Sequence, residues 1–153
     1  MLTRRTFLHS AAAFPLVAIT APQAAHAAQP DILSYDGAAI GGYDPVAYFT
    51  QSAPLLGDAA HTVMRKGVEW RFASAQNRDN FAANPEAYAP QYGGYCAYAA
   101  SKNAVAPTDA NAWTVHEGKL YLNYSTQVRG IWSQDIPGNV ALADGYWPGP
   151  LSN

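Results

Sequence analysis

The chain has 153 residues, and its 9 basic and 11 acidic residues leave a formal net charge of −2 at pH 7. Nucleic-acid-binding proteins carry clustered basic residues on one face, so this scattered and slightly acidic balance excludes that class of partner. The chain has one cysteine, Cys96, which excludes an internal disulfide.

Residues 1–27 predict a cleaved export signal. Arg4 and Arg5 precede an alanine-rich apolar run, and Ala25-His26-Ala27 has the small-x-small pattern of a signal-peptidase site. The sequence around the two arginines resembles a twin-arginine signal, with general export as the alternative. The apolar run is shorter than the roughly 20 residues that a membrane helix requires. We therefore expect a periplasmic mature protein without a transmembrane anchor.

The first elements after the leader are predicted to be short. Residues 28–39 are expected to form a polar lead-in, because Pro30 and Gly37 interrupt regular structure. Asp44-Pro45 predicts the start of one helical turn, since Asp caps helices and Pro fits the first helical position. Residues 52–60 are expected to form a loop.

Two β-hairpins are predicted. Residues 62–65 and 68–72 flank the turn Lys66-Gly67, and residues 113–116 and 119–124 flank the turn Glu117-Gly118. In the first hairpin the alternation places Val68, Trp70 and Phe72 on one apolar face. In the second it separates an apolar face from an expected solvent face that carries Thr114, His116, Lys119, Tyr121 and Asn123.

Helix signals separate and follow the hairpins. Ser74 is a predicted N-cap, and Asn84-Pro85 should end its helix and start another. Gly93-Gly94 allows a bend before Cys96. Ser125 should cap a helix that reaches Trp132, and a last helix is expected from Pro137 to about Gly145. Short antiparallel hairpins interleaved with short helices predict a single small α+β domain.

Several of these segments carry a resemblance to a known family. Gly42–Phe49 (GYDPVAYF), Trp70–Ser74 (WRFAS), Tyr92–Tyr98 (YGGYCAY) and Gly118–Tyr124 (GKLYLNY) are the main matching segments. On these motifs the chain resembles the YHS domain family, in its periplasmic, signal-bearing branch. The resemblance extends over about residues 40–148, which we take as the YHS-like domain.

The resemblance implies a role with metals. Related domains occur in heavy-metal pumps and sensors, with cysteines in Asp-Pro-Val-Cys and Phe-Cys-Ser-x-x-Cys patterns. Here Ala47, Ala73 and Asn77 stand at those cysteine positions. Any metal must therefore be bound by other residues.

Four residues are the candidate metal ligands. Cys96 could act as a thiolate ligand for copper or zinc, and its alternative is a small buried side chain without chemistry. His61 and His116 are the histidines that remain after leader removal, and each could instead be a surface residue. Met64 could add a thioether or fill the core.

Three functions follow from these residues. The first is an exported binding protein for periplasmic soft-metal handling, with copper or zinc as the ion. The second is a metal-free binding module for a small organic ligand or a periplasmic partner protein, using an aromatic cleft drawn from ten tyrosines and four tryptophans. The third is a thiol enzyme, in which a Cys96–His116 pair would also need an orienting Asp or Asn and an oxyanion site.

Overall fold

The computed structural model describes residues 28–152, so the predicted export signal lies outside the described residues. The strands are β1 (Ser34–Tyr35), β2 (Ala38–Ala39), β3 (Asp58–Arg65), β4 (Val68–Phe72), β5 (Asp109–His116) and β6 (Lys119–Asn123). The α-helices are α1 (Ala47–Thr50), α2 (Ala75–Ala83), α3 (Pro85–Tyr88), α4 (Ala97–Ala100), α5 (Thr126–Trp132) and α6 (Ile136–Tyr146). Short 3-10 turns are η1 (Ile40–Gly42), η2 (Gln91–Gly94), η3 (Ser133–Asp135) and η4 (Gly149–Ser152). The predicted α+β class is confirmed.

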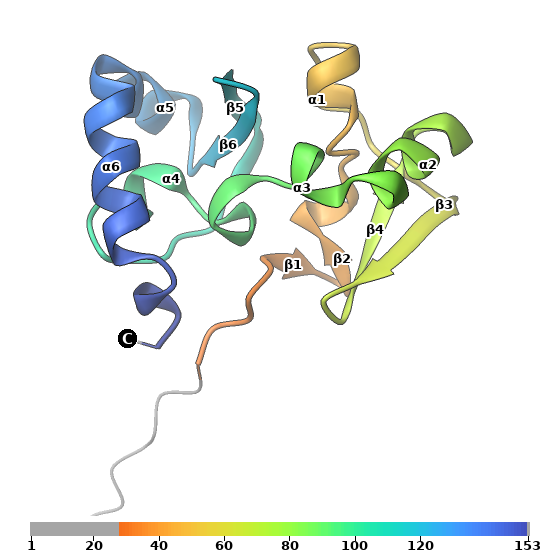
Figure 1. The fold of residues 1–153 in the computed structure, drawn as a ribbon, viewed down its shortest axis with the longest axis horizontal. Coiled ribbons are helices and arrows are strands. Elements are labelled where there is room, and N and C mark those ends of the chain that lie inside the picture. Colours follow the sequence, from red (N-terminus) through yellow and green to blue (C-terminus); the bar gives the residue numbers. More distant parts are fainter. Residues whose placement is uncertain (1–27, 153) are drawn as a thin grey trace, which may run out of the picture.

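The strands form two separate sheets (Figure 1). In the larger sheet the order is β1-β2-β4-β3, with β2 parallel to β4 and the other neighbours antiparallel. In the smaller sheet β5 pairs with β6 alone. We call residues 28–90, which hold the larger sheet with α1, α2 and α3, the sheet half. Residues 91–152, which hold the β5–β6 hairpin with α4, α5 and α6, are the hairpin half.

The turns and caps are those that local chemistry predicts. Ser74 Oγ accepts from the Asn77 amide at 3.2 Å, and Ser125 Oγ accepts from the Val128 amide at 3.2 Å. The helix α2 ends before Asn84, and Pro85 is the first residue of α3. Both hairpin turns adopt positive φ angles, as tight two-residue turns require.

The main core joins the two halves. Trp70 and Phe72 of β4 are buried, and each ring centroid lies 5.1 Å from that of Phe81 in α2. Leu120 and Leu122 of β6 complete this core from the other sheet. The predicted apolar faces of both hairpins are therefore confirmed except at Tyr124, which follows β6 and is exposed, and the two faces contribute to one core.

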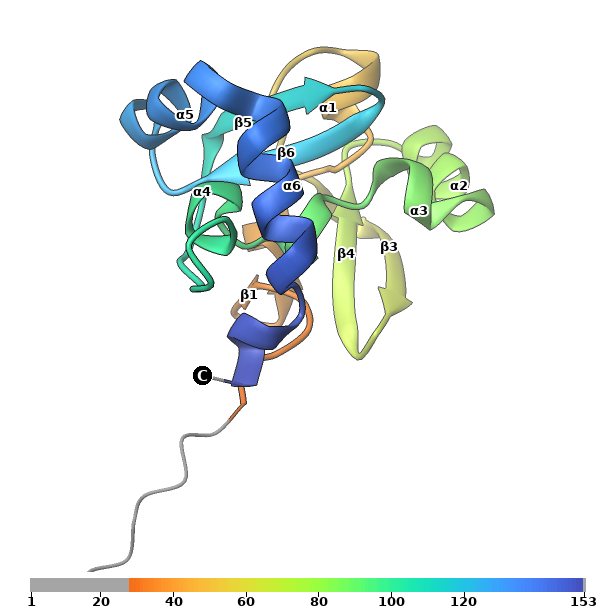
Figure 2. The same cartoon turned by 60° about the vertical axis from the view of Figure 1, so that its left-hand side comes forward.

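The predicted solvent face of the second hairpin is wrong at β6. Tyr121 and Asn123 are as buried as Leu120 and Leu122 on the opposite face. Tyr121 belongs to a second core in which its ring lies 5.2 Å from that of Trp132 in α5. Figure 2 shows α6 lying over this side of the hairpin. The two-residue alternation cannot reveal this layer, because the helices that cover it come later in the chain.

The folded unit also extends beyond residues 40–148. The expected lead-in contains β1 and β2, and it buries Ile32 and Leu33. Its Gln29 amide donates to the Leu151 carbonyl at 2.7 Å, so the two ends of the described chain are joined. Strand β3 likewise begins at Asp58, inside the expected loop. These segments belong to the same single domain, which therefore includes more residues than predicted.

Asp44 connects three segments of the sheet half. Its side chain is fully buried, and Oδ1 accepts from the amides of Val46 and Ala47 at 2.8 and 3.2 Å. Oδ2 accepts from the Ala73 amide at 2.8 Å and from Asn77 Nδ2 at 2.7 Å. One carboxyl group thus holds the start of α1, the end of β4 and the first turn of α2 together.

Within residues 28–152, no helix is both long enough and apolar enough to cross a membrane.

Asp44→Asn should destabilise the fold strongly. An amide keeps one oxygen but presents an NH2 group where the other Asp44 oxygen now accepts two bonds, so one pair of buried donors loses its acceptor. We expect a loss of about 3 kcal/mol or more in the free energy of unfolding, since buried hydrogen bonds to charged groups are worth roughly 1.5–3 kcal/mol each. Urea unfolding measures the loss.

Asp58→Asn is the matched control. Asp58 is exposed, and its carboxylate accepts from the Ala60 amide at 2.8 Å. This change should stay within about 0.5 kcal/mol, as surface substitutions usually do. Equal effects of the two substitutions would contradict the role given to Asp44.

Candidate functional site

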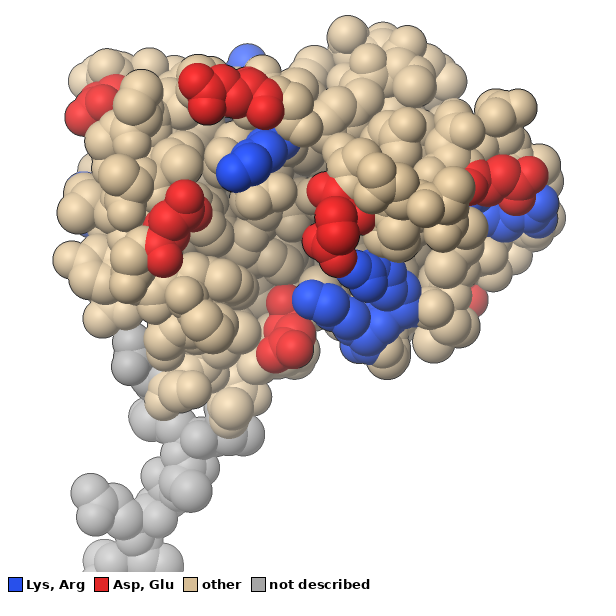
Figure 3. All heavy atoms as spheres, in the orientation of Figure 1, with Lys and Arg blue, Asp and Glu red and all other residues tan. Residues whose placement is uncertain are grey.

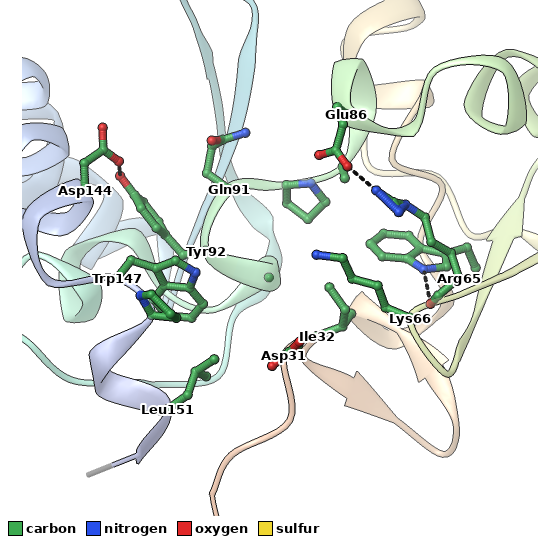
Figure 4. A pocket seen from close by; sticks show the side chains of 15 residues that line it. Asp31, Ile32, Arg65, Lys66, Glu86, Gln91, Tyr92, Asp144, Trp147 and Leu151 are labelled. Carbon is green, nitrogen blue, oxygen red and sulfur yellow. Dashed lines mark hydrogen bonds and ion pairs between the residues drawn. The ribbon is translucent and has the colours of Figure 1, made fainter.

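A cleft of about 530 Å³ lies between the two halves. Its walls come from the β3–β4 turn and α3 on one side, and from η2, α6 and η4 on the other (Figure 4). On the face drawn in Figure 3, basic and acidic side chains gather beside one another where the halves meet. The cleft therefore combines residues from four separate stretches of the sequence, 31–32, 65–70, 86–93 and 144–151.

The wall of the hairpin half is aromatic. Trp147, which directly follows α6, has its ring centroid 5.7 Å from that of Tyr92 and 6.1 Å from that of Tyr95. The Tyr92 hydroxyl donates to Asp144 Oδ1 at 2.9 Å. Burial and this hydrogen bond raise the pKa of Tyr92 above its ordinary value, so the hydroxyl keeps its proton and keeps Asp144 in place.

The wall of the sheet half is basic. Arg65 ends β3, and its guanidinium pairs with Glu86 of α3. This hydrogen bond lowers the pKa of Glu86. The Trp70 indole donates to the Arg65 carbonyl at 3.4 Å, which ties the strand end to the core. Lys66 follows in the turn, is exposed, and points into the cleft (Figure 4).

The floor depends on glycine. Residues 92–94 all have positive φ angles, and a Cβ at Gly93 would collide with the Asp31 carbonyl. The Leu33 amide donates to the Gly93 carbonyl at 2.9 Å. Because Gly93 permits this close backbone approach, Asp31 and Ile32 lie along the bottom of the cleft.

A second hollow, of about 450 Å³, lies behind the aromatic wall. It is lined by Pro30, Leu33, Tyr95 and residues 105–107 among others. The Tyr95 hydroxyl donates to the Pro30 carbonyl at 2.9 Å and closes one side of it. Among the described residues that line this hollow none is charged, whereas charged side chains line the first cleft.

Cys96, the central residue of the metal hypothesis, lies in neither hollow. Its side chain is 1 % exposed and precedes α4. The Sγ donates to Asn123 Oδ1 at 3.7 Å and accepts from the Tyr124 amide at 3.3 Å. The thiol is therefore enclosed, and Asn123 and the Tyr124 amide already supply its hydrogen-bond partners.

The structure does not bring the other predicted ligands to Cys96. His61 and Met64 belong to β3, which Figures 1 and 2 both place on the opposite side of the molecule from α4. His116 pairs with Lys119 at the turn of the second hairpin, whereas Cys96 contacts the other end of β6. Four residues of strand, or about 13 Å, separate these two ends.

Their individual surroundings also differ. Met64 is 67 % exposed, and His61 has an enclosed Nδ1 without a hydrogen-bond partner among the described residues. His116 lies 3.9 Å from Glu117. Across residues 28–152, no group of three or more His, Cys, Asp or Glu side chains could hold a metal ion.

Ala47, Ala73 and Asn77, which stand at the cysteine positions of the YHS pattern, come together around Asp44. The Ala47 amide, the Ala73 amide and the Asn77 side chain all donate to Asp44. In this chain, hydrogen bonds to a carboxylate occupy the place where those positions meet.

Sequence reasoning missed most of the cleft. The turn chemistry of Lys66-Gly67 predicts an exposed lysine, and the abundance of aromatic residues predicts an aromatic cleft in general terms. No pattern in the sequence links Lys66 to Asp144 or to Trp147. Only the packing of the two halves places them around one space.

The Cys96 thiol should be inert in the native protein. With 1 % exposure and two hydrogen-bond partners, it should react with a thiol reagent only after unfolding, at one thiol per chain. Absorbance of the released chromophore measures the reaction with and without denaturant. Fast native labelling, or stoichiometric copper or zinc that Cys96→Ser removes, would restore the metal hypothesis.

The buried phenols predict a loss of stability at alkaline pH. Burial raises the pKa of Tyr48, Tyr92 and Tyr121 above the ordinary value of 10.0. Above this pH the unfolded chain loses protons that the folded chain keeps, so the free energy of unfolding falls as pH rises. Below it the contribution is fully present.

Tyr92→Phe tests this at the cleft. The variant should be less stable than the parent at neutral pH, and its stability should fall less steeply above pH 10, the ordinary phenol value. Denaturant unfolding at a series of pH values measures both slopes. Identical slopes would show that Tyr92 ionises equally well in the folded and unfolded states.

Comparisons with known proteins find no match: no family model, no curated protein and no solved structure matches this chain. Its resemblance to the YHS domain family stays a prediction from the motifs quoted above.

Proposed function

We propose that this chain is an exported, single-domain binding module that takes a small organic ligand in the cleft between Trp147 and Lys66, without a metal. The observation that carries the proposal is the cleft itself. Its volume of about 530 Å³ lies within the range of roughly 300–1,000 Å³ that small-molecule sites occupy. Aromatic rings and a few fixed polar groups, the usual lining of such sites, face each other across it.

The surroundings of Cys96 favour this function over soft-metal handling. A copper or zinc site needs several N or S donors around one point. Cys96 has Asn123 and the Tyr124 amide as its neighbours, and His116 lies at the far end of the hairpin. A metal site would require rearrangement of the chain or a second copy of it.

The lining also favours binding over catalysis. Within the described part of the chain, the cleft is lined by no cysteine, serine, threonine or histidine. The Cys, Ser or Thr nucleophile of a thiol or hydroxyl enzyme is therefore not among the described lining of the cleft, and the Cys96–His116 pair is not assembled. The described lining of the cleft therefore offers a ligand a fitting shape and fixed polar groups, and not a Cys, Ser or Thr nucleophile.

The proposed location follows from the leader. An export signal over residues 1–27 would place the domain in the periplasm, where a ligand-binding module can capture solutes. The exposed rim of the cleft, including Lys66, Glu86 and Asp144, suits a ligand that enters from solvent.

Fragment screening by NMR tests the function. Isotope-labelled protein is titrated with amino acids, nucleobases and aromatic carboxylates, and shifts are followed at the Trp147 indole and at the amides of Lys66 and Gly93. At least one probe class should move these signals together. Trp147→Ala should then weaken its binding by about fivefold or more, since truncation of a central aromatic anchor usually costs above 1 kcal/mol.

Tyr146→Ala is the matched control. Tyr146 precedes Trp147, is 43 % exposed and does not line the cleft, so its loss should leave binding unchanged. Circular dichroism checks that both variants fold. Absence of any shift at the cleft, or one bound copper or zinc ion per purified chain, would refute the proposal.

A further inference from the structure

Charged groups of opposite sign line the cleft from its two walls, with Lys66 on the sheet half and Asp144 on the hairpin half. On the sheet side, Glu86 pairs with Arg65, but within the described chain no carboxylate lies within ion-pair distance of Lys66. The Lys66 ammonium nevertheless points into the space between the halves (Figure 4). The positive charge of Lys66 helps to lower the pKa of Glu86, but Glu86 is engaged by the Arg65 guanidinium, so this wall keeps an excess positive charge for an anionic group of a ligand.

The opposite wall is suited to a cation. Asp144 Oδ1 accepts from Tyr92, and no cationic side chain of the described residues pairs with its carboxylate. The Trp147 ring lines the same wall. A carboxylate and an indole on the same wall both attract an ammonium group, the first through its charge and the second through the negative face of its ring. The tie to Tyr92 limits the movement of Asp144, so less ordering is needed when a ligand binds.

The charged groups that line the cleft also argue against a ligand that carries only negative charge. Besides Lys66, the unpaired charged groups that line the cleft are Asp144 and Asp31, both acidic. A ligand with only negative charge would gain at Lys66 and be repelled at the other two. A ligand with only positive charge would leave Lys66 facing a like charge.

On the basis of the proposed cleft function, we infer that the ligand is a zwitterionic amine, such as an amino acid or a short peptide. Its ammonium group lies between Asp144 and the Trp147 ring, and its carboxylate faces Lys66. The specificity of the site then lies in the separation of the two charges, which the spacing of the two walls selects. Lys66 and Asp144 are the residues that determine this specificity.

Calorimetric titration with matched compounds tests the inference. ω-Aminohexanoic acid carries both charges, while hexylamine and hexanoic acid each lack one on the same carbon chain. The butanoic and octanoic ω-amino acids vary the separation. The best-fitting zwitterion should bind roughly three- to fivefold more tightly than either singly charged compound, since an exposed ion pair contributes up to about 1 kcal/mol. High salt should reduce the difference.

Two variants assign the charges to the walls. Lys66→Met should bring the zwitterion down to the affinity of the amine, and it should not weaken the amine, which loses a like charge. Asp144→Asn, which keeps an acceptor for Tyr92, should bring the zwitterion down to the affinity of the acid. Lys66 lies in an exposed turn, so its replacement should not disturb folding.

The outcomes separate this inference from the proposed function. If fragments bind at Trp147 but zwitterions of every length bind no better than singly charged compounds, the inference is wrong and the cleft function stands. An equal loss of all three compounds in Lys66→Met would likewise overturn it, because a structural role would act on every ligand. If no compound and no fragment binds in the cleft, both are wrong.

Discussion

The buried carboxyl of Asp44 is the interaction on which the sheet half depends. It accepts four hydrogen bonds from groups in α1, in the residue after β4, and in α2. A fully buried carboxyl is costly to place unless its oxygens are satisfied, and here each accepts two bonds. The same arrangement fixes α2 above β4, which lets Phe81 pack on Trp70 and Phe72. The position of the first core thus follows from one polar group at its edge.

The second constraint is the burial of β6 on both faces. Leu120 and Leu122 face the core shared with the sheet half, whereas Tyr121 faces Trp132 and the C-terminal helices. A hairpin enclosed in this way cannot shift without exposing one of the two cores. It therefore sets the distance between the halves, and with it the width of the cleft. Gly93 closes the bottom, because only a residue without a Cβ admits the Asp31 carbonyl so closely.

The reactive thiol and the charged side chains lie in different parts of the protein. The thiol is in the interior, and charged side chains line the cleft between the two halves. Cys96, the residue with the greatest intrinsic reactivity, is enclosed beside Asn123 at the end of β6. Lys66 and Asp144, which are ordinary surface residues in the sequence, face a common space. Binding through aromatic surface and placed charges is the function that we propose for this arrangement. The proposed ligand is accordingly defined by where its charges lie, and not by a bond that the protein would make or break.

Local chemistry in the sequence determined the elements. Ser74 and Ser125 cap helices because a hydroxyl satisfies an orphan amide within three residues, and Lys66-Gly67 and Glu117-Gly118 turn because of their backbone preferences. The apolar faces of both hairpins follow from the alternation of apolar and polar residues. Like the helix caps and the turns, this signal acts over only a few residues. Tertiary structure alone decided that Tyr121 is buried, that Ile32 and Leu33 belong to the domain, and that Cys96 lies far from His116. It also decided that Lys66 and Asp144 line the same cleft. These residues are 78 positions apart, and they come to one cleft only because the sheet half and the hairpin half pack around a shared core.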